Sequence, residues 1–215
     1  KNYFYNCRIT GNENTYQNQG GGGVYMFGGS TWYYNCEISH NSSYIGGAGI
    51  LGSSGSKVFI YNSAIYNNKV VYAPEDWGGG GIYNAGDLYV ENSTISGNSH
   101  PRRGGGIYNL LYDRNIHLNH VTITGNSAGI GGGIYNRDKD ENGTDTIWLK
   151  NTIVAGNSAS SESDDLWGAY ISEGNNLIQD SSGAVIIGVV ETNLYNTDPL
   201  LGNLGYFTQQ TQHHQ

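Results

Sequence analysis

Residues 88–109 read LYVENSTISGNSHPRRGGGIYN, and this unit decides the fold because it recurs along the chain. Each copy has an Ile-x-x-Asn block, and a variable loop then leads to a glycine run followed by Ile-Tyr-Asn or a related triplet. Successive closing asparagines are 29, 27, 30, 28 and 31 residues apart, at Asn12, Asn41, Asn68, Asn98, Asn126 and Asn157. A period of this length is typical of solenoids, and its variation indicates a fixed rung with loops of different size.

Each period contains three short strand-like stretches and no helical pattern. The sequence therefore predicts an all-β fold, a three-sheet parallel β-helix (β-solenoid) of about six to seven coils. Stacked coils place equivalent residues about 4.8 Å apart, so each alignment column becomes a ladder of like side chains. The predicted inward columns are Phe4, Tyr33, Ile60, Val90, Leu118 and Leu149; Ile9, Ile38, Ile65, Ile95, Ile123 and Val154; and Val24, Ile50, Ile82, Ile107 and Ile134.

The corner before the second strand of each coil has a column of asparagines, which tolerate turn conformations and form amide ladders. Its members are Asn6, Asn35, Asn62, Asn92, His120 in the fifth coil, and Asn151. Glycine runs such as 104–106 lack the strand-turn-helix setting of a phosphate-binding loop. They predict tight bends with positive φ rather than nucleotide binding.

These motifs resemble the right-handed parallel β-helix of the pectin-lyase-like superfamily. The GGGIYN and Ile-x-x-Asn pairs are similar to polymorphic outer-membrane-protein type repeats and to bacterial secreted proteins with a "choice-of-anchor" ending. Those families show GGA-I and F-x-x-N motifs; residues 47–50 come near the first, and Ile replaces Phe in the second. The resemblance implies an extracellular or cell-surface location and a fold that hosts both adhesins and polysaccharide-cleaving enzymes.

The chain divides into three predicted parts. Residues 1–160 form the repeat coils, 161–204 an irregular last coil with a closing segment similar to that of the secreted proteins, and 205–215 a polar tail. The tail is rich in Gln and Thr and is expected to be disordered or to pair with an open strand edge.

Composition fits a secreted protein. The chain has 34 glycines, 13% charged residues and a formal net charge of −8, which disfavours nucleic acid and anionic membranes as partners. No apolar run is long enough to predict a transmembrane segment. The absence of an initiating Met and of a signal-peptide pattern leads us to expect a processed piece of a longer precursor.

Cys7 and Cys36 fall in one column of adjacent coils. The expected spacing of about 4.8 Å permits a disulfide, but parallel ladder side chains fit its dihedral angle poorly. Two reduced, stacked thiols are the alternative.

The sequence predicts no enzyme activity. Polysaccharide-cleaving enzymes use clustered acids, and no acids share a column in neighbouring coils; Glu37, Glu91 and Arg8 are scattered over outward positions. The six histidines show no metal-binding spacing. No cofactor is expected, although calcium is possible at one loop. Asp138, Asp140, Asn142 and Asp145 match the first half of a calcium loop, with a polar Asn-Gly turn as the alternative.

Outward positions of the first strand form an axial file of aromatic side chains, which predicts a binding surface. The candidate binding residues are Tyr3, Trp32, Phe59, Tyr89 and Trp148, with His117 in the same file. A second file, Tyr25, Tyr83, Tyr108 and Tyr135, follows the glycine corners. Three interpretations stay open: sugar rings stack on the aromatics, neighbouring subunits pack laterally, or surface loops cover the stripe.

The functional expectation is a non-catalytic structural or adhesive β-solenoid outside the cell. The first residues already lie in the strand register without a cap, so self-association end to end into a fibre is predicted. The alternative is a polysaccharide-binding or polysaccharide-cleaving protein of the pectin-lyase-like group. The two functions would be distinguished by whether acidic side chains from neighbouring coils converge in a groove.

Overall fold

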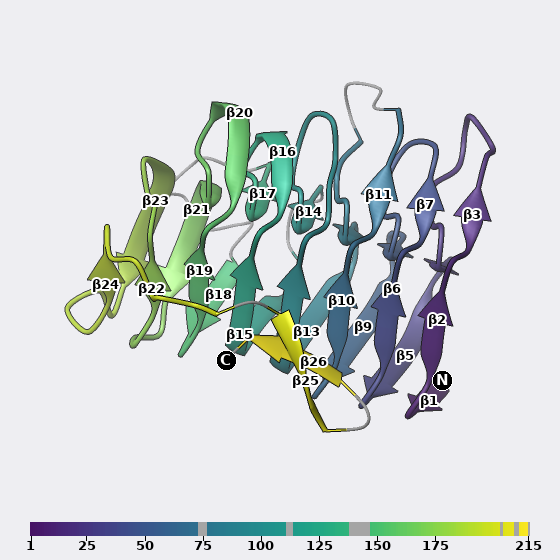
Figure 1. Cartoon of the computed structure of the whole chain (residues 1–215), viewed down its shortest axis with the longest axis horizontal. Helices are drawn as coiled ribbons and strands as arrows, with labels where there is room; N and C mark the ends of the chain where they lie inside the picture. The colour runs from purple at the N-terminus through teal and green to yellow at the C-terminus, as the bar shows by residue number, and fades with distance from the viewer. Residues whose placement is uncertain (73–76, 111–113, 138–146, 203, 209–210, 215) are drawn as a thin grey trace.

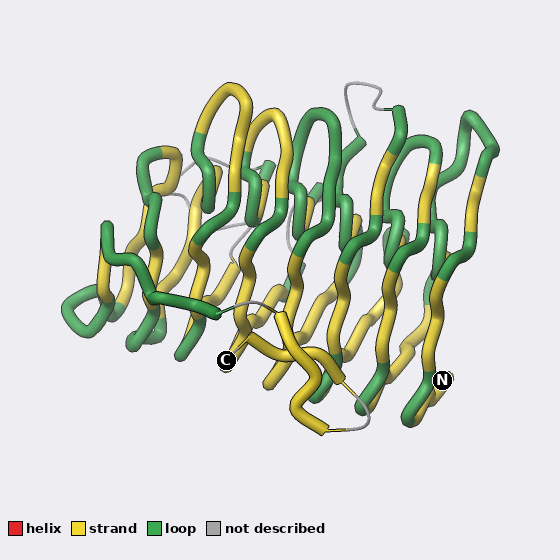
Figure 2. Tube along the Cα trace, viewed as in Figure 1, coloured by secondary structure: helices red, strands yellow, loops and turns green. Residues whose placement is uncertain are grey.

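A computed structural model describes residues 1–72, 77–110, 114–137 and 147–202, and the backbone of 204–208 and 211–214. No helix occurs among these residues, and the strands form a solenoid whose coils stack along its long axis (Figures 1 and 2). All strand pairs are parallel except the pair at the C-terminus. The predicted all-β parallel β-helix is confirmed.

Three ladders make the sides of the coil. The first contains β1 (Asn2–Tyr5), β5 (Gly29–Tyr34), β9 (Ser56–Tyr61), β13 (Asp87–Ser96), β15 (Ile116–Thr124), β18 (Ile147–Lys150), β21 (Leu166–Ser172) and β23 (Gly183–Gly188). The second contains β2 (Arg8–Thr10), β6 (Glu37–Ser39), β10 (Ala64–Tyr66), the second halves of β13 and β15, β19 (Ile153–Ala155), β22 (Leu177–Ile178) and β24 (Leu194–Tyr195). The third contains β4 (Val24–Met26), β8 (Ile50–Gly52), β12 (Ile82–Asn84), β14 (Ile107–Asn109), β17 (Ile134–Asn136) and the start of β21.

A short fourth ladder follows the closing asparagines, where the sequence predicted only loops. Its strands are β3 (Glu13–Asn14), β7 (Ser42–Ser43) and β11 (Lys69–Val70), then β16 (Ser127–Ile130) and β20 (Ser158–Glu162), and single bridges through Ser99 join the two groups. These strands are two to five residues long, too short for alternation to be recognised in the sequence. Regular parallel pairing also continues beyond residue 160, as far as Tyr195.

The predicted inward columns form the core. Tyr33, Ile38, Ile60, Ile95 and their column neighbours are buried in one apolar cluster that runs through the coils. Phe4 occupies the inward column of the first rung and stacks on Tyr33, but it keeps 37% of its surface exposed. Each rung is one side chain thick, so a buried position touches mainly the coils above and below it.

Amide ladders hold the corners. Each closing asparagine from Asn12 to Asn126 donates its backbone and side-chain nitrogens to the side-chain oxygen of the asparagine in the next coil, at 2.8–3.0 Å. Asp165 ends this ladder by accepting from Asn157 at 2.8 Å. The other predicted corner column has φ near 50°, which asparagine tolerates well. Burial without these bonds would cost about 1–3 kcal/mol per amide.

The glycine runs allow the predicted bend and also allow neighbouring coils to approach each other closely. Gly104 has φ +61°, as the bend requires. Gly105 has an ordinary φ, but a Cβ there would lie 2.5 Å from the carbonyl oxygens of Gly132 and Ser127. Neighbouring coils therefore approach too closely at this corner for a side chain.

The C-terminal tail forms an antiparallel hairpin, β25 (Leu204–Thr208) with β26 (Thr211–His214). It lies against β10 and β13 on the outer face of the second ladder (Figure 1). The expectation of a disordered tail or of pairing with a solenoid edge is wrong, because the hairpin pairs with itself and packs on a side of the coil.

Candidate binding surface

The outer face of the first ladder presents two columns of side chains, because alternate residues of each strand point outward. One column is the predicted file of rings, called the ring file below: Tyr3, Trp32, Phe59, Tyr89, His117 and Trp148. The other, two residues further along each strand, is called the polar column below: Tyr61, Glu91, Asn119, Lys150 and Glu173. Tyr34 and Tyr5 continue the polar column toward the N-terminus.

The ring file is one continuous stack. Consecutive ring centroids are 4.7, 4.7, 4.8, 5.2 and 4.6 Å apart from Tyr3 to Trp148, and their planes deviate by 3–15°. The predicted alignment is thus correct, and the rings beyond Tyr3 are partly buried. Each stacked pair contributes about 0.5–1.5 kcal/mol beyond its burial, so the ring file also stabilises the fold.

This stacking limits how a ligand can use the rings. A ring inside the stack has a neighbour on each face, so solvent meets mainly its edge. Face-on stacking of successive sugar units along the whole file, as one interpretation of the sequence required, is therefore disfavoured. Ring edges offer C–H groups and the Tyr and Trp polar atoms instead.

A groove of about 260 Å³ lies at the C-terminal end of the ring file. It is bounded by the rings of Tyr89, His117 and Trp148 and by the polar column. Its lining residues are Tyr61, Tyr89, Val90, Glu91, His117, Leu118, Asn119, Trp148, Lys150 and Glu173. Of the predicted binding residues, the groove includes Tyr89 and Trp148, whereas Tyr3, Trp32 and Phe59 lie along the stack outside it.

The groove has charges available to a ligand. In the part of the chain that the structure describes, Glu91, Lys150 and Glu173 form no ion pair. Burial lowers the pKa of His117, against the opposing effect of Glu173 and Asp87. The imidazole is thus neutral near pH 7, which leaves two carboxylates and one ammonium group in the groove.

The groove acids are far apart. Glu91, Asn119, Lys150 and Glu173 belong to successive coils, so about 14 Å separates the Glu91 and Glu173 positions along the axis. Glycosidases hold their two carboxyl groups about 5–9.5 Å apart. The spacing of Glu91 and Glu173 does not suit two-carboxylate hydrolysis in this groove.

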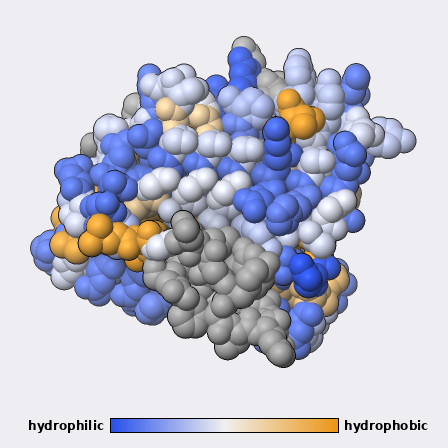
Figure 3. All heavy atoms as spheres, viewed as in Figure 1, coloured by the Kyte–Doolittle hydropathy of each residue, from blue (hydrophilic) through white to orange (hydrophobic). Residues whose placement is uncertain are grey.

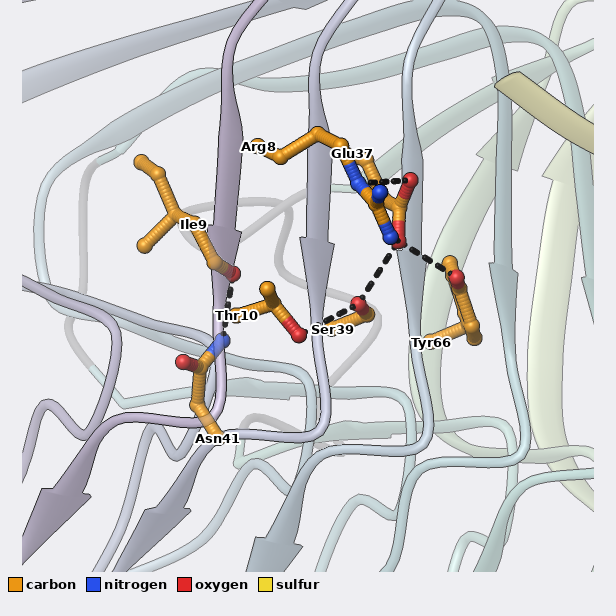
Figure 4. Close-up of polar contacts among 7 residues, drawn as sticks. All are labelled: Arg8, Ile9, Thr10, Glu37, Ser39, Asn41 and Tyr66. Carbon is orange, nitrogen blue, oxygen red and sulfur yellow. Dashed lines mark hydrogen bonds and ion pairs between the residues drawn. The ribbon is translucent and has the colours of Figure 1, made fainter. Parts of the chain in front are cut away.

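Glu37 is the acid that the sequence placed outward on the second ladder, yet it is buried. Its carboxylate accepts from Arg8 at 2.9 Å, from Tyr66 at 2.6 Å and from Ser39 at 3.0 Å (Figure 4). Burial alone would raise the pKa of Glu37, but these partners together lower it. Its oxygens are occupied by protein donors, which indicates a structural role.

The second predicted file is not a surface. Tyr25 is half exposed, but Tyr83, Tyr108 and Tyr135, called the tyrosine file below, are buried in a second apolar cluster. Trp77 packs on Tyr83 at 5.0 Å, and the Arg103 guanidinium lies over Tyr135 at 5.4 Å. Of the three interpretations that the sequence left open, coverage by loops is the one that holds for these rings, because nonrepeating loop residues such as Trp77 and Arg103 pack on them.

The predicted calcium residues Asp138, Asp140, Asn142 and Asp145 lie outside the described residues. Among the described residues, no three His, Cys, Asp or Glu side chains gather as they would around a metal ion. The described part of the chain also has no helix that could cross a membrane.

Sequence reasoning missed the polar column as a set. Glu91 was predicted to point outward, but its relation to Glu173 depends on the register of β18 with β21, which lies beyond the regular repeat. Counting two positions past each ring of the ring file finds Glu91, Asn119 and Lys150; only the structure adds Glu173.

Comparison with known proteins supports the fold. A protein-family model described as "Right handed beta helix region" matches residues 2–187. No curated protein and no solved structure matches the chain. Since the match spans most of the sequence and agrees with the parallel ladders, this chain belongs to the right-handed β-helix family.

Proposed function

We propose that this chain is a non-catalytic, adhesive β-solenoid of the cell surface or extracellular space that binds a polysaccharide in the groove beside Trp148. The observation that carries the proposal is the groove itself, where the stacked ring file meets the unpaired charges of Glu91, Lys150 and Glu173. Sugars suit such a site, because their hydroxyl groups pair with polar side chains while their C–H faces contact aromatic atoms.

The charge of the site favours a glycan with free amino groups. Two carboxylates outnumber one ammonium group in the groove, and the whole chain has a net charge of −8. Charge-assisted hydrogen bonds from an amino sugar to Glu91 or Glu173 would be stronger than neutral ones, whereas a uronic acid polymer would be repelled.

The proposal includes the absence of catalysis and of a cofactor. In the groove, the separation of Glu91 and Glu173 by about 14 Å does not suit paired acid–base hydrolysis. Incubation of the protein with amino-sugar and uronic acid polymers should release no new reducing ends or unsaturated products. Release of either would show that the protein is an enzyme.

Binding is tested with two tryptophan variants that each remove one ring of the ring file. Trp148 lines the groove and Trp32 does not, so Trp32→Ala is the matched control. With glucosamine oligomers as the probe in titration calorimetry, Trp148→Ala should weaken binding about tenfold, or ~1.4 kcal/mol, and Trp32→Ala should leave it unchanged. Equal losses in both variants, or no binding by the wild type, would contradict the proposal.

A second candidate, end-to-end self-association, has its own observation. The last coil exposes Val189, Val190 and Leu194 and has an open depression of about 470 Å³ lined in part by Ile186 and Tyr195. Hydrophobic atoms gather at the left end of the molecule in Figure 3. The first coil exposes the side chain of Phe4. Parallel strands give the two ends opposite edges, so a head-to-tail contact would repeat into a filament.

Light scattering tests this candidate. Leu194→Asp should remove concentration-dependent association, whereas Val71→Asp, at an exposed valine in a loop, should not. A wild-type protein that stays monomeric at high concentration would exclude filament formation by this chain alone.

A further inference from the structure

Cys7 and Cys36 lie opposite each other in adjacent coils. Tyr5 pairs with Tyr34 before them and Arg8 with Glu37 after them, and the Cys7 carbonyl accepts from the Glu37 amide at 2.8 Å. Neighbouring parallel strands hold equivalent Cα atoms about 4.8 Å apart, within the range of about 4.4–6.8 Å that a disulfide needs. The backbone therefore requires no rearrangement for the two sulfurs to bond.

Hydroxyl groups occupy most of the same column in later coils. The Ser63 hydroxyl donates to Tyr61 at 2.7 Å and accepts from the Cys36 amide at 2.9 Å. Ser93 and Thr152 repeat this pattern. The thiols make only longer contacts, from Cys7 to Tyr5 at 3.2 Å and from Cys36 to Tyr34 at 3.3 Å. Thiols are weaker hydrogen-bonding groups than hydroxyls, so cysteine stabilises this ladder less than serine does. Cysteine has an advantage at these positions only if its sulfur reacts.

The two thiols differ in accessibility. Cys7 is partly exposed in the first coil, whereas Cys36 is fully buried. Burial is the main cause that raises the pKa of the Cys36 thiol. An external reagent therefore meets Cys7 first.

We propose that Cys7 and Cys36 form an oxidation-dependent disulfide clamp between the first two coils, with a low-molecular-weight disulfide as the oxidant. The Cys7 thiolate attacks one sulfur of the oxidant, the S–S bond of the oxidant breaks, and one small thiol leaves after taking up a proton. Cys36 then loses its proton and attacks the Cys7 sulfur of the mixed disulfide. The second small thiol leaves, so two protein thiols have been oxidised and the oxidant has been reduced to two thiols.

The clamp would act locally. It would tie β1 and β2, whose residues are the most exposed of their ladders, to β5 and β6. Coils of a solenoid contact only their neighbours, so the later coils would gain little directly. Closing a loop of about 30 residues corresponds to a rise in Tm of roughly 7–15 °C for a domain of this size, if the first coils limit melting.

The experiment treats the full chain with oxidised glutathione and measures its intact mass after alkylation. The proposal predicts loss of two hydrogens, no alkylated cysteine, and slower hydrogen exchange of amides in β1, β2, β5 and β6, with β13 and β15 unchanged. Cys7→Ser is the first control; it should stay folded, show none of these changes and carry one unreactive buried thiol.

A second control separates accessibility from spacing. The double variant Cys7→Ser with Ser63→Cys places two thiols at positions 36 and 63 of the same column, both in buried surroundings. It should oxidise at least tenfold more slowly than the wild type. Stable glutathionylation at Cys7 alone, intermolecular dimers, or two free thiols in the oxidised wild type would overturn the proposal.

Discussion

The ring file and the tyrosine file follow the same coils, but one is open and the other is covered. Both are stacks of aromatic rings: Phe59 and Tyr89 are 4.8 Å apart in the first, and Tyr108 and Tyr135 are 5.4 Å apart in the second. Tyr89 remains partly exposed, whereas Tyr108 is completely buried. The repeat thus sets the stacking, and the residues outside the repeat set the exposure.

The cover of the tyrosine file comes from the loops between repeats. The loop before Gly104 contributes Arg103, which lies over Tyr135 and hydrogen-bonds to Tyr108. His100 holds this loop in shape, since its Nδ1 accepts from the amides of Arg102 and Arg103 at 3.0 Å each. A ladder of tyrosines is therefore a surface or a core depending on such loops.

The largest expected effect compares removal of one ring from each file. Tyr108→Ala should lower the free energy of unfolding by about 3–5 kcal/mol, because it empties a fully buried site. Phe59→Ala, its matched control in the ring file, should cost about 1–2 kcal/mol, since it loses two stacking contacts at a partly exposed position. Urea denaturation measures both, and equal costs would remove the distinction between the files.

Lowering the pH should destabilise the side of the coil that contains the tyrosine file and the loop that covers it. Burial, together with the charges of Arg102 and Arg103, lowers the pKa of His100 to about 4 against the opposing influence of the Ile45 backbone. Because the pKa of His100 is lower in the folded chain than in the unfolded chain, this contribution to the free energy of unfolding is fully present above the unfolded pKa of about 6.5. It is lost as the pH falls toward 4, by about 3 kcal/mol at most.

Groups other than His100 also titrate between pH 4 and 7. The prediction therefore compares the acid-induced loss of stability in a His100 variant with that in the wild type. Burial raises the pKa of Asp165 to about 6, which stabilises the fold as pH falls and opposes the effect of His100. His100→Asn keeps a side-chain acceptor for the loop but cannot be protonated. Thermal melts from pH 7 to 4.5 should show a smaller acid-induced loss in His100→Asn than in the wild type, and parallel curves would contradict this role.

The smallest expected effect comes from removing Arg103, a loop residue that packs on the tyrosine file. Arg103→Ala should cost about 1–2 kcal/mol, since it removes a hydrogen bond to Tyr108 and a cation–π contact with Tyr135. Arg114→Ala, at a partly exposed arginine with one hydrogen bond at 3.5 Å, is the control and should cost less than 0.5 kcal/mol. The two denaturation midpoints give the comparison directly.

The sequence predicted which residues of each coil point inward or outward better than it predicted which outward residues are exposed. Alternation within each repeat was enough to place Ile95, Val90 and the ring file, because strand periodicity fixes which face a residue occupies. It left open whether loops cover Tyr108, and it did not predict the burial of Glu37, since both depend on where Arg103, Tyr66 and other residues from different segments fold back. The pairing of β21 with β18, which brings Glu173 next to Lys150, likewise lies outside the repeat.

Hydroxyl-radical footprinting with and without glucosamine oligomers tests the account most directly, because it reports the exposure of every ring in one experiment. Without ligand, Tyr3, Tyr89 and Trp148 should be oxidised and Tyr108 and Tyr83 spared. With ligand, Trp148 and Tyr89 should become protected, whereas Tyr3 and Trp32 should react as before. Equal oxidation of the two files, or protection that spreads over Tyr3 or is absent at Trp148, would contradict an open ring file with its binding groove at one end.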